Sequence, residues 1–76
     1  MGVIGTTVGK RIRRYRQEKG LTQWQLSQAA NVTPATIFLL ERGDKKCTKH
    51  LVRAIASALG VSEADIYGKK KEEENI

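Results

Sequence analysis

Residues 21–43 read LTQWQLSQAANVTPATIFLLERG, a pattern that predicts two short helices joined by a tight turn. Its first half predicts a short helix capped at Thr22, because Gln25 follows three residues later and the two residues can bond each other's backbone N–H groups in a capping box. Asn31 falls where the chain must turn, and asparagine tolerates a positive φ better than most residues do. The first half of the stretch is therefore expected to form a short helix that ends in a tight turn.

The second half of the stretch predicts another helix. Thr33 can cap it, Pro34 suits its first position because the missing N–H costs nothing there, and Gly43 can end it. Small side chains at Ser27 and Ala30 leave room for the two helices to cross steeply. The apolar residues expected on the buried edge are Leu26, Val32, Ile37 and Leu40. This is the layout of a helix-turn-helix, whose second helix can lie in a DNA major groove.

The spacing of this set of residues resembles the Xre/Cro family, the lambda-repressor-like DNA-binding domains. The residues that carry the resemblance are Arg16, Leu21-Thr22-Gln23, Leu26-Ser27, Asn31-Val32-Thr33, Ile37, Glu41-Arg42-Gly43 and the run Ala54–Ser62. It covers roughly Val8 to Tyr67. The resemblance implies an all-α fold, a five-helix lambda-repressor-like bundle with a central helix-turn-helix, and it implies DNA as the partner.

Outside the central stretch, three further helices are expected. The first should begin at Thr6 or Thr7 and run to about Lys19, with the apolar stripe Val8, Ile12 and Tyr15 at helical spacing. The fourth should be capped by Thr48 and ended by Gly60, with the apolar stripe Leu51, Val52, Ile55 and Leu59. A capping box of Ser62 and Asp65 predicts a short fifth helix that ends at Tyr67.

These helices divide the chain into three parts. Residues 1–5 are rich in glycine and are expected to form a flexible N-terminus. Residues 6–68 should form the helix-turn-helix DNA-binding domain, because 76 residues suffice for one core and not for two. Residues 69–76 read KKKEEENI and have no apolar period, which is typical of a charged, disordered tail.

The charge distribution favours a polyanionic partner. The net charge is +6, and residues 1–53 carry 11 Lys and Arg against 3 acidic residues, a balance of +8. Residues 54–76 carry 3 Lys against 5 acidic residues, a balance of −2. The excess of positive charge therefore lies on the segment that contains the helix-turn-helix, as expected of a protein that binds nucleic acid.

The residues that catalysis or a metal site would need are not present in sufficient number. One cysteine, Cys47, and one histidine, His50, fall at C-x-x-H spacing, but a structural zinc ion takes four ligands. No glycine-rich loop for phosphate and no stretch of ~20 apolar residues for a membrane occurs. We expect a cytoplasmic protein that is not an enzyme and needs no cofactor or metal; the lone cysteine also fits a reducing compartment.

The resemblance assigns structural and phosphate-binding roles to several residues. It implies that Arg16 pairs with Glu41 and so joins the first helix to the end of the third. It also implies that Gln23, at the start of the second helix, grips the DNA backbone, beside free N–H groups that suit a phosphate oxygen. The candidate phosphate contacts are Gln23, Arg42, Lys45, Lys46 and Lys49.

Base readout is expected from the outward face of the third helix. The resemblance places Pro34, Ala35, Phe38 and Leu39 there, where such repressors commonly carry Gln, Asn, Arg or Ser. These apolar side chains could pack on thymine methyl groups, with Thr33, Thr36 and Arg42 adding polar contacts. They could instead form a protein-binding patch with Trp24, as in an antitoxin-like or anti-repressor protein. A third possibility is a rotated helix that tucks Phe38 against Trp24 inside the domain.

The predicted function is that of a sequence-specific transcriptional regulator that binds double-stranded DNA, such as a repressor. A helix this short covers only a few base pairs, so we expect a homodimer on an inverted repeat, with half-sites about 34–36 Å apart. By analogy with the family, Val61, Ile66 and Tyr67 are the candidates for the dimer surface, although Ile66 also fits the core.

Overall fold

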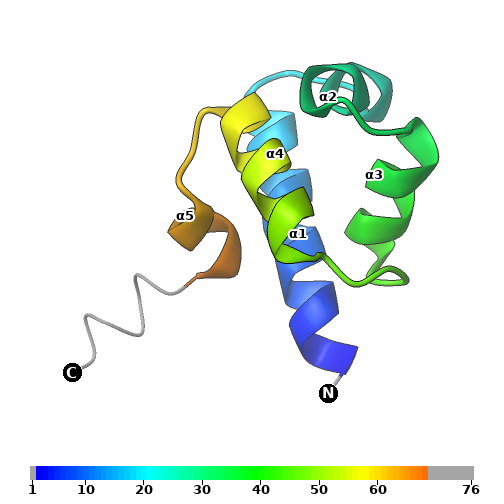
Figure 1. Cartoon of the computed structure of the whole chain (residues 1–76), viewed down its shortest axis with the longest axis vertical. Coiled ribbons are helices and arrows are strands. Elements are labelled where there is room, and N and C mark those ends of the chain that lie inside the picture. Colours follow the sequence, from blue (N-terminus) through cyan, green and yellow to red (C-terminus); the bar gives the residue numbers. More distant parts are fainter. Residues whose placement is uncertain (1, 69–76) are drawn as a thin grey trace.

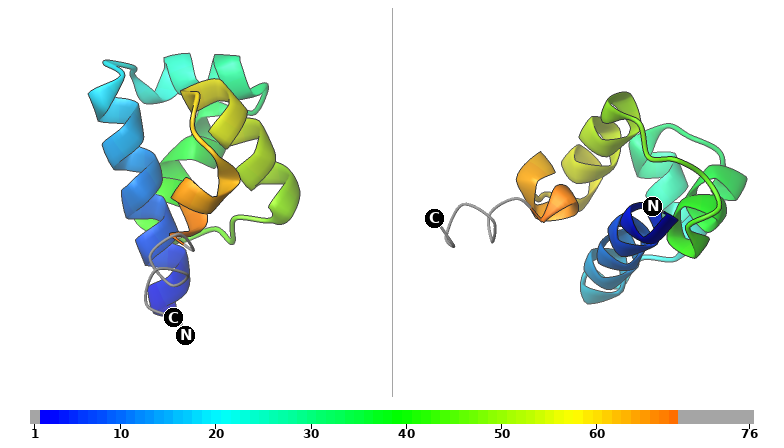
Figure 2. Two further views of the ribbon diagram at one scale, coloured as in Figure 1. Left: turned by 90° about the vertical axis from the view of Figure 1, so that its left-hand side faces the viewer. Right: turned by 90° about the horizontal axis from the view of Figure 1, so that it is seen from below.

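The computed structural model describes residues 2–68, with side chains from residue 7 onward (Figure 1). Five helices make up this part of the chain. They are α1 (Gly2–Glu18), α2 (Gln23–Ala30), α3 (Pro34–Arg42), α4 (Lys49–Leu59) and α5 (Glu63–Tyr67). α3 lies on one side of α1 and α5 on the other, as the right-hand view of Figure 2 also shows. α2 packs against α3 and α4, so the predicted five-helix bundle is confirmed.

The predicted helix-turn-helix is formed by α2, α3 and the turn between them. The Thr22 hydroxyl oxygen accepts a hydrogen bond from the Gln25 N–H at 3.0 Å, and the Gln25 amide oxygen accepts one from the Thr22 N–H at 2.9 Å. Asn31 has a φ of 59°, the left-handed conformation that the turn was predicted to need. The other predicted caps are present at Thr33, Gly43, Thr48, Gly60 and Ser62.

The core lies where α1, α2, α3, α4 and α5 meet. Its largest fully buried side chains are Ile12, Leu26, Ile37, Leu40, Val52, Ile55, Leu59 and Ile66. The predicted stripes supply most of them, while Tyr15, Val32 and Leu51 pack at the margin. Ser27 is fully buried, and its hydroxyl donates a 2.6 Å hydrogen bond to the Trp24 carbonyl, so this polar group in the core is satisfied.

The predicted start of the first helix was wrong. α1 begins at Gly2 and not at Thr6 or Thr7. Threonine also fits inside a helix, and once the packed turns around Val8 and Ile12 have formed, each added residue gains a hydrogen bond without a new nucleation cost. The flexibility expected of residues 1–5 stays a prediction, and the charged tail, residues 69–76, lies outside the described residues.

Two contacts of α1 fix its position in the bundle. A Cβ atom at Gly9 would overlap the Leu40 carbonyl oxygen and lie 2.9 Å from that of Glu41, so only glycine allows α1 this close to α3. On the opposite side, the Arg11 guanidinium donates a 3.2 Å hydrogen bond to the Tyr67 carbonyl at the end of α5. These contacts hold α3 and α5 to the two sides of α1.

Candidate nucleic-acid interface

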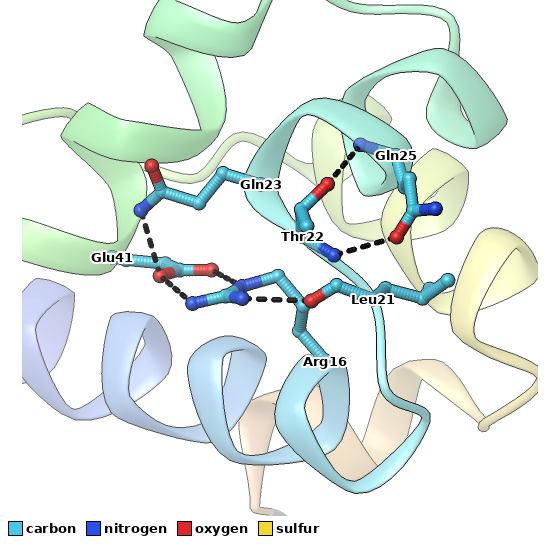
Figure 3. Close-up of polar contacts among 6 residues, drawn as sticks. All are labelled: Arg16, Leu21, Thr22, Gln23, Gln25 and Glu41. Atoms are coloured by element: carbon cyan, nitrogen blue, oxygen red, sulfur yellow. Dashed lines mark hydrogen bonds and ion pairs between the residues drawn. The ribbon is translucent and has the colours of Figure 1, made fainter.

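A buried ion pair joins α1, α2 and α3 behind the helix-turn-helix (Figure 3). Arg16 Nε lies 2.6 Å from Glu41 Oε2 and Arg16 Nη2 lies 3.0 Å from Glu41 Oε1, while the two side chains are only 11% and 4% exposed. Arg16 Nη1 also donates to the Leu21 carbonyl at 2.8 Å. The pair that the resemblance implied is therefore present, and the bond to Leu21 additionally holds the entry to α2.

Gln23, the first residue of α2, is tied to the same carboxylate. Its Nε2 donates a 3.1 Å hydrogen bond to Glu41 Oε1, which leaves the second amide N–H without a partner among the described residues (Figure 3). The backbone N–H groups of Gln23 and Trp24 also make no hydrogen bond within residues 2–68. The start of α2 thus offers three N–H donors together with the positive end of the helix dipole, which suits a phosphate oxygen.

No pattern in the sequence indicates the bond between Gln23 and Glu41. The two residues are 18 positions apart and meet only because Arg16 brings the end of α3 next to the start of α2. One consequence is that the phosphate-binding candidate at the start of α2 is linked to the last turn of α3. Arg42 belongs to that turn, and the loop that contains Lys45 and Lys46 follows it.

The outward face of α3 is apolar, as the sequence predicted. Ile37 and Leu40 are fully buried, whereas Phe38 is 44% exposed and Pro34 and Ala35 are also exposed. Leu39 is half-buried. The face that would meet a partner therefore carries apolar side chains at most of its positions.

The rotated-helix possibility is wrong. Trp24 is 60% exposed and Phe38 is 44% exposed, so neither ring is packed inside the domain. The reason is that Ile37 and Leu40 already fill the space behind α3, and a helix can turn only one stripe toward a given core. The thymine-methyl and protein-patch interpretations both stay open.

Thr33, the N-cap of α3, and Thr36 in its first turn are hydrogen-bonded to each other. The Thr33 hydroxyl caps the helix by accepting from the Thr36 N–H at 3.2 Å, and the two hydroxyl oxygens are 2.8 Å apart. One of the two hydroxyl protons lies between these oxygens, so the pair retains one O–H to donate outward.

Arg42, the last residue of α3, has two intramolecular partners that the sequence analysis missed. Its Nε lies 3.0 Å from Asp44 Oδ2, with the two side chains 59% and 49% exposed. Its guanidinium carbon lies 5.4 Å from the centre of the Phe38 ring, within the range of a cation–π contact. A spacing of four residues on one helix could have indicated the contact with Phe38.

The loop between α3 and α4 and the first residue of α4 carry the remaining candidate cations. Lys45 and Lys46 in the loop and Lys49 at the start of α4 are all exposed, and Thr48 fixes the end of the loop by capping α4 through a 3.3 Å bond from the Leu51 N–H. Three exposed ammonium groups therefore lie within seven positions of Arg42 along the chain.

Cys47 and His50 do not form a metal site in the part of the chain described. No group of three or more His, Cys, Asp or Glu side chains gathers there. Cys47 packs against the margin of the core, and burial raises the pKa of its thiol to about 11, which disfavours the thiolate that a metal requires. His50 is exposed at the start of α4.

The burial of Ile66 narrows the candidates for the dimer surface. Ile66 is fully buried and belongs to the core, because α5 closes the bundle with this side chain, whereas Val61 and Tyr67 are partly buried beside it.

No helix within residues 2–68 combines the length and the apolar character that crossing a membrane requires.

Comparison with known proteins identifies the family. The family described as "Helix-turn-helix domain" matches residues 7–66. The immunity repressor protein of Bacillus phage phi105 is 37% identical over 64 residues, 84% of this chain and 44% of that protein, so the chain spans less than half of the repressor's length. An uncharacterized HTH-type transcriptional regulator of Methanothermobacter thermautotrophicus is 45% identical over 49 residues, 64% of this chain and 71% of that protein.

The solved structures agree with the sequence relatives. The clp gene regulator ClgR from C. glutamicum superposes with a TM-score of 0.82 at 31% sequence identity, covering 92% of this chain and 91% of that one. The match to residues 7–66 takes in all of α2, α3 and α4 with the caps and turn described above. The chain is therefore a member of the helix-turn-helix family, of the Xre/Cro, lambda-repressor-like type.

Proposed function

We propose that this chain, a DNA-binding transcriptional regulator of the helix-turn-helix family, acts in the cytoplasm by occupying an inverted-repeat operator as a homodimer. The observation that carries the proposal is the uncovered face of α3, with Phe38 44% exposed at its middle. The start of α2 carries unpaired N–H groups, Lys45 and Lys46 are exposed in the loop that follows α3, and Lys49 is exposed at the start of α4. An apolar surface with anion-binding groups on its rim suits the major groove, whose floor is base edges and whose borders are phosphates.

In this proposal, the residues on the rim bind phosphate and those on the helix meet bases. Gln23, Arg42, Lys45, Lys46 and Lys49 contact the backbone. Thr33, Pro34, Ala35, Thr36, Phe38 and Leu39 face the bases. Arg16 and Glu41 bind no DNA and act by holding α2 and α3 at their crossing angle, since their side chains are almost wholly buried.

Dimerisation is supported by the length of α3. Nine residues can contact only a few base pairs, and a useful operator needs a second copy about one duplex turn, 34–36 Å, away. Val61 and Tyr67, partly buried beside α4 and α5, are the proposed contacts between the two copies.

Selection of bound duplexes from a random pool tests the proposal directly. We expect a palindromic consensus whose affinity falls with salt by roughly 0.9 log units per log unit of salt for each phosphate neutralised. Lys46→Ala should lower that slope by about one contact, whereas Gln23→Ala should weaken binding to all duplexes with the slope unchanged, because glutamine carries no charge. Arg53→Ala, which removes an exposed charge paired with Glu63, is the matched control. A chain that ignores every duplex even in dilute salt would contradict the proposal.

A second candidate function is a protein-interaction module that uses Trp24, Phe38 and Leu39. The exposure of both Trp24 and Phe38 favours it, because buried aromatic side chains are common anchors of interfaces. This function replaces the first one if Trp24→Ala and Phe38→Ala leave every DNA affinity unchanged and abolish the binding of a protein partner.

A further inference from the structure

The outward face of α3 has few hydrogen-bonding groups free to read bases. Thr33 and Thr36 are bonded to each other and retain one O–H between them. Glu41 is buried in the pair with Arg16, and its Oε1 already accepts two hydrogen bonds. The remaining charged side chain of α3 is Arg42.

Two contacts also restrict the conformation of the Arg42 side chain. Asp44 bonds its Nε at 3.0 Å, and its guanidinium lies over the Phe38 ring. Both contacts keep the charge at the carboxyl end of α3, next to the loop of lysines, where the proposed phosphate contacts lie. The middle of the helix is left to Ala35, Phe38 and Leu39.

The major groove offers one apolar group to such a surface. It is the methyl group at C5 of thymine, since every other position on the major-groove edges is a hydrogen-bond donor, an acceptor or a ring C–H. A cytosine methylated at C5 presents the same group. Thymine and 5-methylcytosine differ beside the methyl, where thymine has the O4 acceptor and cytosine the N4 donor.

We infer that α3 selects its operator by burying C5-methyl groups of pyrimidines against Phe38, with Ala35 and Leu39 beside it. This inference rests on the proposed function, and it names the chemical group of the DNA that α3 recognises. Charge favours DNA over a protein as the occupant of the face, because Lys45 and Lys46 in the loop after α3 and Lys49 at the start of α4 are exposed, and the unpaired N–H groups at the start of α2 favour an anion.

The test uses the duplex enriched from the random pool and three modified copies of it. In the first copy, deoxyuridine replaces thymidine, which removes the methyl and leaves the base pairing intact. In the second and third copies, 5-methylcytosine and plain cytosine, each paired with guanine, replace the thymines at which removal of the methyl weakened binding. We expect the deoxyuridine copy to bind about three- to fourfold more weakly for each methyl that the wild-type protein buries.

Phe38→Ala assigns the effect to a residue. With this variant the thymidine and deoxyuridine duplexes should bind equally well, while Trp24→Ala, which removes another exposed ring from α2, should keep the wild-type ratio. Phe38 is 44% exposed, so the variant should stay folded, and the wild-type comparison of the two duplexes needs no variant. If 5-methylcytosine restores the affinity that plain cytosine lacks, both bases serve as the source of the methyl; if it does not, thymine alone does.

The outcomes separate this inference from the function on which it rests. No enriched duplex means that the proposed DNA binding is wrong. An enriched duplex that binds equally well with deoxyuridine, or a methyl effect that Phe38→Ala leaves intact, overturns the inference while DNA binding stands. Capture of a protein that Phe38→Ala abolishes, with DNA affinity unchanged, also overturns it.

Discussion

Glu41 and Arg42 are neighbours in the last turn of α3, and each forms an ion pair of the same chemical kind. Glu41 binds Arg16 with two N–O contacts of 2.6 and 3.0 Å, and both side chains are almost fully buried. Arg42 binds Asp44 through one contact of 3.0 Å, and both side chains are about half exposed. Distance alone would rank the two pairs as similar, although burial makes them very different.

The difference lies in what each pair leaves behind when it is broken. Arg16 also satisfies the Leu21 carbonyl and Glu41 also satisfies the Gln23 amide, so removing either partner strands the other charge and one of these polar groups. Water can replace either partner of the exposed pair. We therefore expect the pair of Glu41 to stabilise the fold and the pair of Arg42 to influence binding.

The largest effect should come from breaking the buried pair. Arg16→Met or Glu41→Leu alone should lower the free energy of unfolding by about 3–5 kcal/mol, because the partner's charge is left buried and unpaired. For a domain of this size, with roughly 4–11 kcal/mol in total, either variant is close to unfolding. The double variant should recover much of the loss, since no unpaired charge remains. Urea titration measures all three.

Arg14→Ala is the control for that experiment. It breaks the pair of Arg14 with Glu18, whose side chains are 61% and 62% exposed at 3.8 Å, and should cost no more than about 0.5 kcal/mol. If Arg16→Met lowers the free energy of unfolding as little as Arg14→Ala does, burial does not make the pair of Arg16 and Glu41 more stabilising than an exposed pair.

Local rules explain why the helix ends other than the start of α1 were predictable. The capping box of Thr22 and Gln25, the turn at Asn31 and the cap at Thr33 each depend on residues within four positions of one another. The Arg16–Glu41 pair spans 25 positions and was anticipated through the family resemblance. The bond from Gln23 to Glu41 had no such guide, because it exists only after α1 has brought α2 and α3 together.

The candidate site likewise has features that were predicted and features that depend on the folded structure. The family resemblance implied which residues of α3 face outward, and Ile37 and Leu40 fill the core behind them. The sequence did not show that Phe38 and Trp24 are both exposed, because an apolar side chain fits a core, a protein interface or a groove equally well. The contact of Arg42 with Phe38 follows the four-residue spacing of one helix face, whereas its contact with Asp44 depends on how the chain turns at Gly43.

A smaller loss of stability is expected from substituting Gly9, where α1 packs closely against the end of α3. A methyl group there would overlap the backbone carbonyl of Leu40, which cannot move without shifting the turn that carries Glu41. Gly9→Ala gains about 1 kcal/mol of helix propensity, so a net loss of about 1–3 kcal/mol would show that the close contact outweighs it. Thermal or urea unfolding gives the sign. Ser57→Ala, at an exposed position in α4, is the control and should change stability by less than about 0.5 kcal/mol.

The smallest effect on stability, and the most informative for function, is expected at Asp44. Asp44→Asn removes the charge that holds Arg42 and should change the free energy of unfolding by less than about 1 kcal/mol. It should strengthen binding to the selected duplex by up to about fivefold, because Arg42 then meets phosphate without first losing a carboxylate partner. Glu63→Gln makes the same change in net charge on α5, where it frees Arg53 instead. If both variants raise the affinity equally, the cause is the overall charge and Arg42 has no special position; a gain confined to Asp44→Asn means that Asp44 competes with the DNA backbone for Arg42.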